Sequence, residues 1–191
     1  GEEMVRMIER ARKHSDTVGG KYEIRATGLP AGLGSYVHYA RKLDGRLAGV
    51  LMSKQSVKAV EIGEGDRLGS LFGSDAHDEI FFSKTGGYYH KTNRAGGIEG
   101  GMTNGEDLIV RVTMKPIATL SRPLVSVNMR TKKTEKADFE RSDFCAVPAG
   151  SVIGEALVAF VLADAFLEKF GGDSLTEIRR NFNGYLKQIR S

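Results

Sequence analysis

The spacing of apolar residues switches along the chain between a helical and an extended period, and the switches predict the order of its elements. Val5, Ile8 and Ala11 recur at helical spacing and predict a first helix from about Glu2 to His14. Acidic residues early and basic residues late in this segment suit the dipole of a helix. Further helices are predicted over residues 43–51, over residues 151–170 and from residue 174 onward.

The last two predicted helices carry local signals for where one stops and the next starts. Gly171 and Gly172 are expected to end the long apolar helix. Ser174 and Glu177 have the spacing of a capping box, which predicts the start of the final helix. The residues expected to pack that helix against its partner are Ile178, Phe182, Tyr185 and Ile189.

Alternation of apolar and polar residues predicts an antiparallel sheet in the middle of the chain. The interval from Gly63 to Asp78 is polar and spotted with glycine, so it is expected to be a long surface loop. The order helix, strand, helix, sheet, helix, helix predicts an α+β fold, and the length predicts one unit over residues 1–191 without an internal boundary. The predicted strands cover residues 21–27, 57–62, 80–83, 108–117 and 124–131.

The segment Thr92–Gly105 concentrates backbone flexibility in one place, with five glycines and two asparagines in fourteen residues. Glycine loses more conformational entropy on folding than other residues, so a dense run needs a reason other than stability. The run does not match a phosphate loop or a dinucleotide-binding fingerprint. Two interpretations remain open, namely a glycine-packed crossing of two strands and a close contact of the backbone with a ligand.

The charge balance narrows the choice of partner. The net charge is +4 and the pI is near 9.2, without the clustered excess of a dedicated nucleic-acid binder. A small anionic ligand is sufficient to explain this balance, and no nucleic-acid partner is expected. The basic stretch at residues 130–136, RTKKTEK, is interpreted as a solvated loop, with phosphate contact or an RNA-binding role as the minor hypothesis.

Other features indicate a soluble protein of a reducing compartment, and we expect a cytoplasmic location. Cys145 is the single cysteine, so no intrachain disulfide is possible. The charged start of the chain does not look like a signal peptide, and it resembles the middle of a longer sequence. The apolar region Val152–Phe170 contains four charged residues, which favours a buried helix over a membrane span.

Two short segments combine charge with a structural boundary. Arg141 and Asp143 come shortly before the long apolar helix, where both could line an anion-facing pocket, although a surface ion pair explains them equally well. Residues 115–119, KPIAT, end a strand with a cation, a proline and a hydroxyl. The four histidines are scattered and no second cysteine is present, so no metal site is expected.

Six segments, in order, carry a resemblance to a known family. They are GLPAGLGSYVHYARKLDGRLAG at 28–49, VKAVEIG at 57–63, HDEI at 77–80, TNRAGGIEGGMTNG at 92–105, KPIATL at 115–120 and RSDFCAVPAG at 141–150. With these segments the chain closely resembles the C-terminal half of chorismate synthase, from Gly1 to about Ile178. The family's N-terminal half, which holds its two catalytic histidines, has no counterpart among these residues, so none of the histidines here should inherit those roles.

The resemblance implies a fold, a reaction and an assembly. The implied fold is a sandwich of antiparallel β-sheets around a helical layer, in a homotetramer. The implied activity is that of a carbon–oxygen lyase of the shikimate pathway, which supplies aromatic amino-acid biosynthesis. It converts 5-enolpyruvylshikimate 3-phosphate to chorismate and phosphate by 1,4-anti elimination and uses reduced FMN. Reduction of the flavin by a nicotinamide cofactor such as NADPH and reduction by an outside enzyme both remain open.

The family's functional residues carry over onto positions of this sequence. By resemblance, Arg141 and Asp143 are the catalytic residues, with the arginine at flavin and substrate and the aspartate beside the flavin N5. Relatives often have asparagine and alanine at positions 55 and 56. An alternative hypothesis is a non-catalytic fragment or assembly module, because the N-terminal half is missing. The implied flavin-binding residues are Gln55, Ser56, Gly100, Lys115, Pro116, Ile117, Ala118, Thr119 and Arg141.

Overall fold

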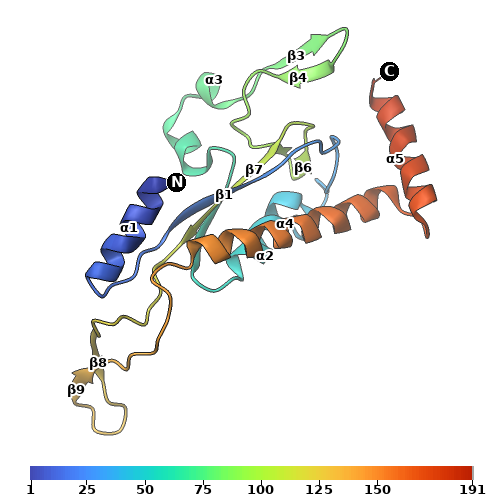
Figure 1. Ribbon diagram of the computed structural model, residues 1–191. Coiled ribbons are helices and arrows are strands. Elements are labelled where there is room, and N and C mark those ends of the chain that lie inside the picture. The colour runs from blue at the N-terminus through green and yellow to red at the C-terminus, as the bar shows by residue number, and fades with distance from the viewer. Residues whose placement is uncertain (191) are drawn as a thin grey trace.

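The central sheet is built around one strand whose side chains are buried alternately. The computed structural model describes residues 1–190. In it, β7 (Leu108–Met114) lies between β1 (Gly20–Ala26) and β2 (Val57–Ile62) in an antiparallel three-stranded sheet (Figure 1). Every second residue of β7 is buried, because successive side chains of a strand point to opposite faces of the sheet.

Two helices cover the apolar face of this sheet. α2 (Leu43–Met52) packs against β2, and α4 (Val147–Phe170) packs against β1 and against α2 (Figure 1). Leu43, Leu47 and Leu51 lie on one face of α2 and are completely buried. Removal of these side chains from water is the main force that holds the helices on the sheet.

The final helix, α5 (Leu175–Arg190), attaches to the end of α4 through aromatic rings. Phe170 contacts the rings of Phe182 and Tyr185, with centroids 5.2 and 5.6 Å apart. The predicted cap is confirmed, since the Glu177 amide donates to Ser174 Oγ at 3.3 Å. The prediction for Ile189 is wrong, because this side chain is 40% exposed.

An ion-pair network joins the start of α2 to the second half of α4. Arg41, in η1 (Tyr39–Arg41), donates to Glu168 at 2.6 Å, and Arg46 pairs with both Glu168 and Asp164. The hydrogen bond from Arg41, with the charges of both arginines, lowers the pKa of the Glu168 carboxyl despite partial burial. The network lies on the surface, so it orients the helices more than it stabilises them.

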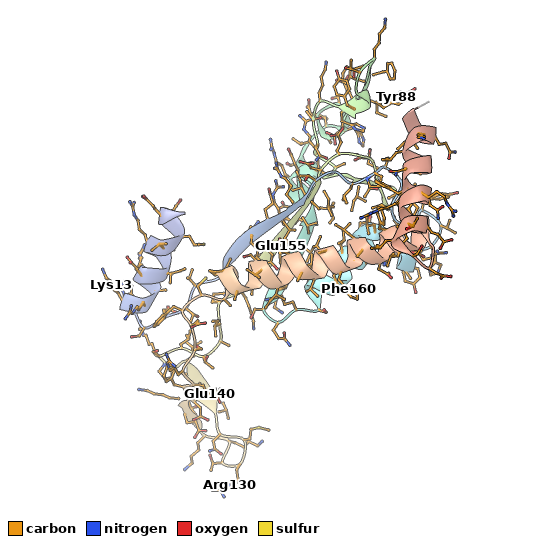
Figure 2. All side chains as sticks on the ribbon, turned by 45° about the vertical axis from the view of Figure 1, so that its right-hand side comes forward. Lys13, Tyr88, Arg130, Glu140, Glu155 and Phe160 are labelled. Atoms are coloured by element: carbon orange, nitrogen blue, oxygen red, sulfur yellow. The ribbon has the colours of Figure 1, made fainter. Side chains whose placement is uncertain are left out.

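Three elements extend from the sheet and its helices. α1 (Glu2–Lys13) buries none of its residues. The hairpin of β3 (Ile80–Ser83) and β4 (Gly87–His90) projects on the side of the glycine-rich segment, with Tyr88 on it, and the hairpin of β8 (Val125–Val127) and β9 (Thr134–Lys136) projects at the far side with Arg130 near its tip (Figures 1 and 2). The remaining short elements are η2 (Gly65–Ser70), α3 (Gly73–Ala76), β5 (Ile98–Glu99) and β6 (Met102–Thr103).

Several predicted boundaries differ from the structure. The strand expected over residues 124–131 shrinks to β8, which pairs only with β9 and not with the central sheet, and all its residues are exposed. The long helix begins at Val147 rather than at residue 151, because Pro148 has a backbone suited to a first helical turn. The interval expected to be a loop at 63–78 contains the short helices η2 and α3.

Among the described residues, α4 is the one helix that is long and apolar enough to cross a membrane. Length and composition alone are weak grounds, because core helices of soluble proteins meet the same criterion. α4 contacts β1 and α2 along one face, while 33% of its most apolar window is buried. Its other face carries exposed apolar side chains, among them Phe160, at 77% exposed (Figure 2).

Candidate functional site

Two of the predicted flavin-binding segments meet where the central strand ends. Pro116 has no backbone N–H, so β7 cannot continue past it, and the strand predicted to reach residue 117 stops at Met114. The Lys115 amide donates to the carbonyl oxygen of Ser56 at 2.8 Å. Ser56 has a φ of +69°, a left-handed conformation that turns this carbonyl toward the strand end. Residues 55–56 and 115–119 therefore adjoin one another.

The segment of Arg141 and Asp143 is brought to the same end of the sheet by hydroxyl hydrogen bonds. Thr119 Oγ1 donates to Ser142 Oγ at 2.9 Å, and Ser142 lies between Arg141 and Asp143 in the sequence. Thr17 Oγ1 donates to the carbonyl of Ile117 at 2.6 Å. The backbone loops before β1, after β7 and before α4 are thus tied together.

The charged side chains at this strand end are exposed, and none of them forms an ion pair with another described residue. In the described part of the chain, Lys115, Arg141 and Asp143 make no ion pair within 4.0 Å. The expected pocket at the helix N-terminus is not formed by Arg141 and Asp143, which are exposed and precede the first turn of α4. The cleft nearest to them, of about 690 Å³, is lined by Cys145, Val147 and α1.

The glycine-rich segment forms the β5–β6 hairpin, and most of its glycines are required by packing. A Cβ on Gly97 would lie 2.6 Å from the Asp107 carbonyl oxygen, and one on Gly101 would lie 2.7 Å from the Ser35 carbonyl oxygen. Gly96 packs against the backbone of Gly63 with no room for a side chain. Packing therefore explains this part of the run, but the contacts are with turns and loops and not with a second strand, so a crossing of two strands is not what the structure shows.

Gly100 is different from its neighbours. It has a φ of +60°, and a Cβ at this position would meet nothing within 4 Å. Gly100 lies at the opposite end of β7 from Lys115, since the adjacent Gly101 carbonyl accepts the amide of Leu43, the first residue of α2. Seven residues of β7 span about 20 Å. The structure therefore does not bring Gly100 together with the other predicted flavin-binding residues.

Asp78 was not singled out from the sequence, although it stands in the HDEI segment of the resemblance. Its carboxylate accepts hydrogen bonds from Thr92 Oγ1 at 2.5 Å and from the amides of Arg94 and Ala95, both at 2.9 Å. Burial raises the pKa of this carboxyl, but the hydrogen bonds from Ala95, Thr92 and Arg94 and the nearby His90 outweigh it, so the pKa lies below its ordinary value. The carboxylate is therefore ionised at neutral pH and holds the start of the glycine run.

The ring of His90 lies between two carboxylates. Nδ1 is 3.2 Å from Glu106, and Nε2 is 4.0 Å from Glu99. His38, in contrast, is exposed and caps η1 by accepting the Ala40 amide. No residue spacing in the sequence signals the His90 cluster, because His90 lies in β4, Glu99 in β5 and Glu106 in the segment before β7.

The chain is an α+β protein in which three loops with exposed charged side chains meet at one end of the central strand. A family model described as chorismate synthase matches residues 1–167. Relatives named chorismate synthase from Geobacter sulfurreducens and Desulforudis audaxviator are each 56% identical over 100% of this chain, which covers 50% and 49% of their lengths. A solved structure described as "Crystal Structure of Chorismate Synthase" has a TM-score of 0.83 and 41% identity, over 99% of this chain and 49% of its own.

The chain belongs to the chorismate synthase family, and its fold is the α+β fold of that family. The resemblance inferred from six sequence segments is thereby confirmed. The chain spans about half the length of the curated relatives it matches.

Replacement of Gly97 by alanine should be far more harmful than replacement of Gly100. Both residues have a left-handed backbone, which costs an alanine about 1–2 kcal/mol. Gly97→Ala should cost about 1–3 kcal/mol more, because its Cβ overlaps the Asp107 carbonyl. Denaturant unfolding of the two variants measures the difference, and equal free energies of unfolding would contradict the assignment of Gly97 to packing and Gly100 to open space.

Proposed function

We propose that this chain forms part of a chorismate synthase, which converts 5-enolpyruvylshikimate 3-phosphate to chorismate and phosphate by 1,4-anti elimination. The observation that supports it best is the meeting of residues 55–56, 115–119 and 141–143 at one end of the sheet. These segments are remote in the sequence, and the resemblance implies a role at the flavin for residues in each of them. The substrate carries two carboxylates and a phosphate, which suits the unpaired cations found there.

The residues at this strand end fit an FMN group. Lys115 and Arg141 offer positive charge to its phosphate and to the electron-rich ring, and neither is neutralised by an acid of the described chain. The Ser56 carbonyl is already occupied by the Lys115 amide, so the backbone here is fixed before any ligand arrives. Reduced flavin supplies electron density as the carbon–oxygen bond of the substrate breaks.

The side chains of the chain have separate roles in this proposal. Arg141 binds a substrate carboxylate or phosphate through its planar group of donors, which matches these anions in a bidentate way. Asp143 handles the proton that leaves the substrate, because a carboxylate in this position can act as a general base. Gly100 contributes from the opposite end of the sheet, so a complete site requires residues beyond this strand end.

A second proposal, that the chain by itself is a non-catalytic module, is favoured by its uncovered apolar surface. Val152, Ile153, Phe160 and Leu167 of α4 are between 49% and 77% exposed. We infer that the remaining half of the family sequence covers this face of α4, since the relatives contain about as much chain again. The assembled protein is then a soluble cytoplasmic homotetramer, with its flavin reduced by NADPH or by an outside reductase.

The isolated 191-residue chain should show no turnover. Its proposed site lacks the residues supplied by the other half of the family, so neither the two catalytic histidines implied by the resemblance nor the full substrate pocket is present. Chorismate formation from 5-enolpyruvylshikimate 3-phosphate, followed by absorbance with reduced FMN, measures this. The same chain joined to the N-terminal half of the Geobacter sulfurreducens relative should be active. Activity of the isolated chain would refute the module, and inactivity of the joined protein, once shown to be folded, would count against the proposed reaction.

Asp143→Asn in the joined protein should lower kcat by about 10²–10⁴-fold, because a general base contributes on that scale. Affinity for FMN should change little, since the asparagine keeps the size of the side chain and removes only its charge. Single-turnover kinetics and an FMN titration separate the two quantities. Asp138→Asn, at an exposed position just after β9, is the matched control. An unchanged kcat in Asp143→Asn would show that Asp143 does not handle the proton.

Lys115→Ala should weaken FMN binding by about 3- to 30-fold, the range expected for a charge-assisted contact that is partly open to solvent. The backbone bond from residue 115 to Ser56 is kept, so the fold of the strand end should be preserved. Lys133→Ala, in the exposed loop between β8 and β9, provides a control for the loss of one positive charge. Fluorescence titration measures the dissociation constant, and equal constants for the two variants would contradict the role of Lys115.

A further inference from the structure

We propose that Asp78 is a positioning residue for the Gly100 turn, which it presents to the ligand through the backbone of the glycine run. This inference rests on the proposed function, because it assumes that the turn contributes to the flavin site. Asp78 contacts neither Gly100 nor the strand-end site. It acts on residues 92–95, the first part of the run, through three hydrogen bonds to one carboxylate.

The three hydrogen bonds to Asp78 affect the turn because the residues that follow them are tightly packed and cannot move independently. Arg94 and Ala95, whose amides Asp78 holds, directly precede Gly96 and Gly97. Those two glycines pack against Gly63 and the Asp107 carbonyl without space for a Cβ. Residues 95–97 therefore form a rigid connection from Asp78 to β5. The position of Ala95 thereby determines the position of the Gly100 turn at the end of β5.

The other flank of the turn is held from the same side of the molecule. The His90 amide donates to Glu106 Oε1 at 2.8 Å, and the His90 ring faces Glu99, the neighbour of Gly100. Asn104 Nδ2 also donates to Glu99, at 2.9 Å. The His90 side chain is 9% exposed, and its Nε2, which has no hydrogen-bond partner in the described chain, lies 4.0 Å from a Glu99 carboxylate oxygen. Asp78 thus holds the start of the run, and His90 lies beside Glu99 at the turn.

Gly100, at the tip of the turn, has no packing role, unlike Gly101 beside it, and this directs the inference toward a ligand. Glu99 and Gly100 are exposed, and Gly100 has no protein atom where its side chain would be. Ala95 and Glu99 line an open cleft of about 340 Å³ together with Leu68, Leu71 and Asp78. Hydrogen bonds to an ionised carboxylate are among the strongest available, and here they hold a loop that bears an exposed backbone.

The test compares Asp78→Asn with Glu79→Gln, its exposed neighbour, which removes the same charge without touching the run. In the 191-residue chain, Asp78→Asn should speed amide hydrogen exchange over residues 92–105 and leave β7 unchanged. In the protein joined to the N-terminal half of the Geobacter sulfurreducens relative, it should weaken FMN binding by about 2- to 30-fold, the range for residues that act through a network. Glu79→Gln should do neither.

A double-mutant cycle with Gly100→Ala distinguishes positioning from general destabilisation. Once Gly100→Ala has damaged the contact, adding Asp78→Asn should weaken FMN binding no further. Additive losses, faster exchange throughout β7, or an FMN affinity equal to that of Glu79→Gln would overturn the role of Asp78. If Lys115→Ala weakens binding while Asp78→Asn does not, the inference fails alone. If the unaltered joined protein does not bind FMN, the proposed function fails with it.

Discussion

The structure depends on the burial of β7 between two antiparallel strands and beneath two helices. Leu108, Val110, Val112 and Met114 face the helical layer and are at most 2% exposed. Because β7 is the central strand, its length fixes the distance between the loops at its two ends. One end carries the charged segments assigned to flavin and substrate, and the other carries the glycine hairpin. The length of β7 therefore also sets the distance between the two parts of the proposed site.

The glycines of the run have two kinds of surroundings, tight backbone packing and open space, which composition alone could not distinguish. Gly96, Gly97 and Gly101 lack side chains because backbones approach each other there, whereas Gly100 lacks one without any steric need within this chain. The first group is explained by packing alone. The open position at Gly100 leaves room for the ligand contact proposed for it, and β7 separates it from Lys115.

The chain has an uncovered apolar surface on two of its helices. A helix as apolar as α4 is stable in water only when most of its surface is covered, and here one face packs on the sheet while the other is open. α1 likewise has an apolar side over a cleft and buries nothing. These open faces are the surfaces that we propose contact the other half of the family sequence, since the chain spans about half the length of its relatives.

The sequence by itself determined the family, the α+β class and the elements whose signals are local. β2 and β3 begin and end at the predicted residues, because alternation and flanking turn residues act over a few positions. Tertiary structure decided where those elements go. β8 has the alternation of a strand, yet no sheet edge lies within its reach, so it forms only a hairpin with exposed side chains. Contacts between distant segments create the features that spacing along the chain does not encode. They are the hydrogen bonds to the Asp78 carboxylate, the position of His90 between Glu99 and Glu106, and the separation of Gly100 from Lys115.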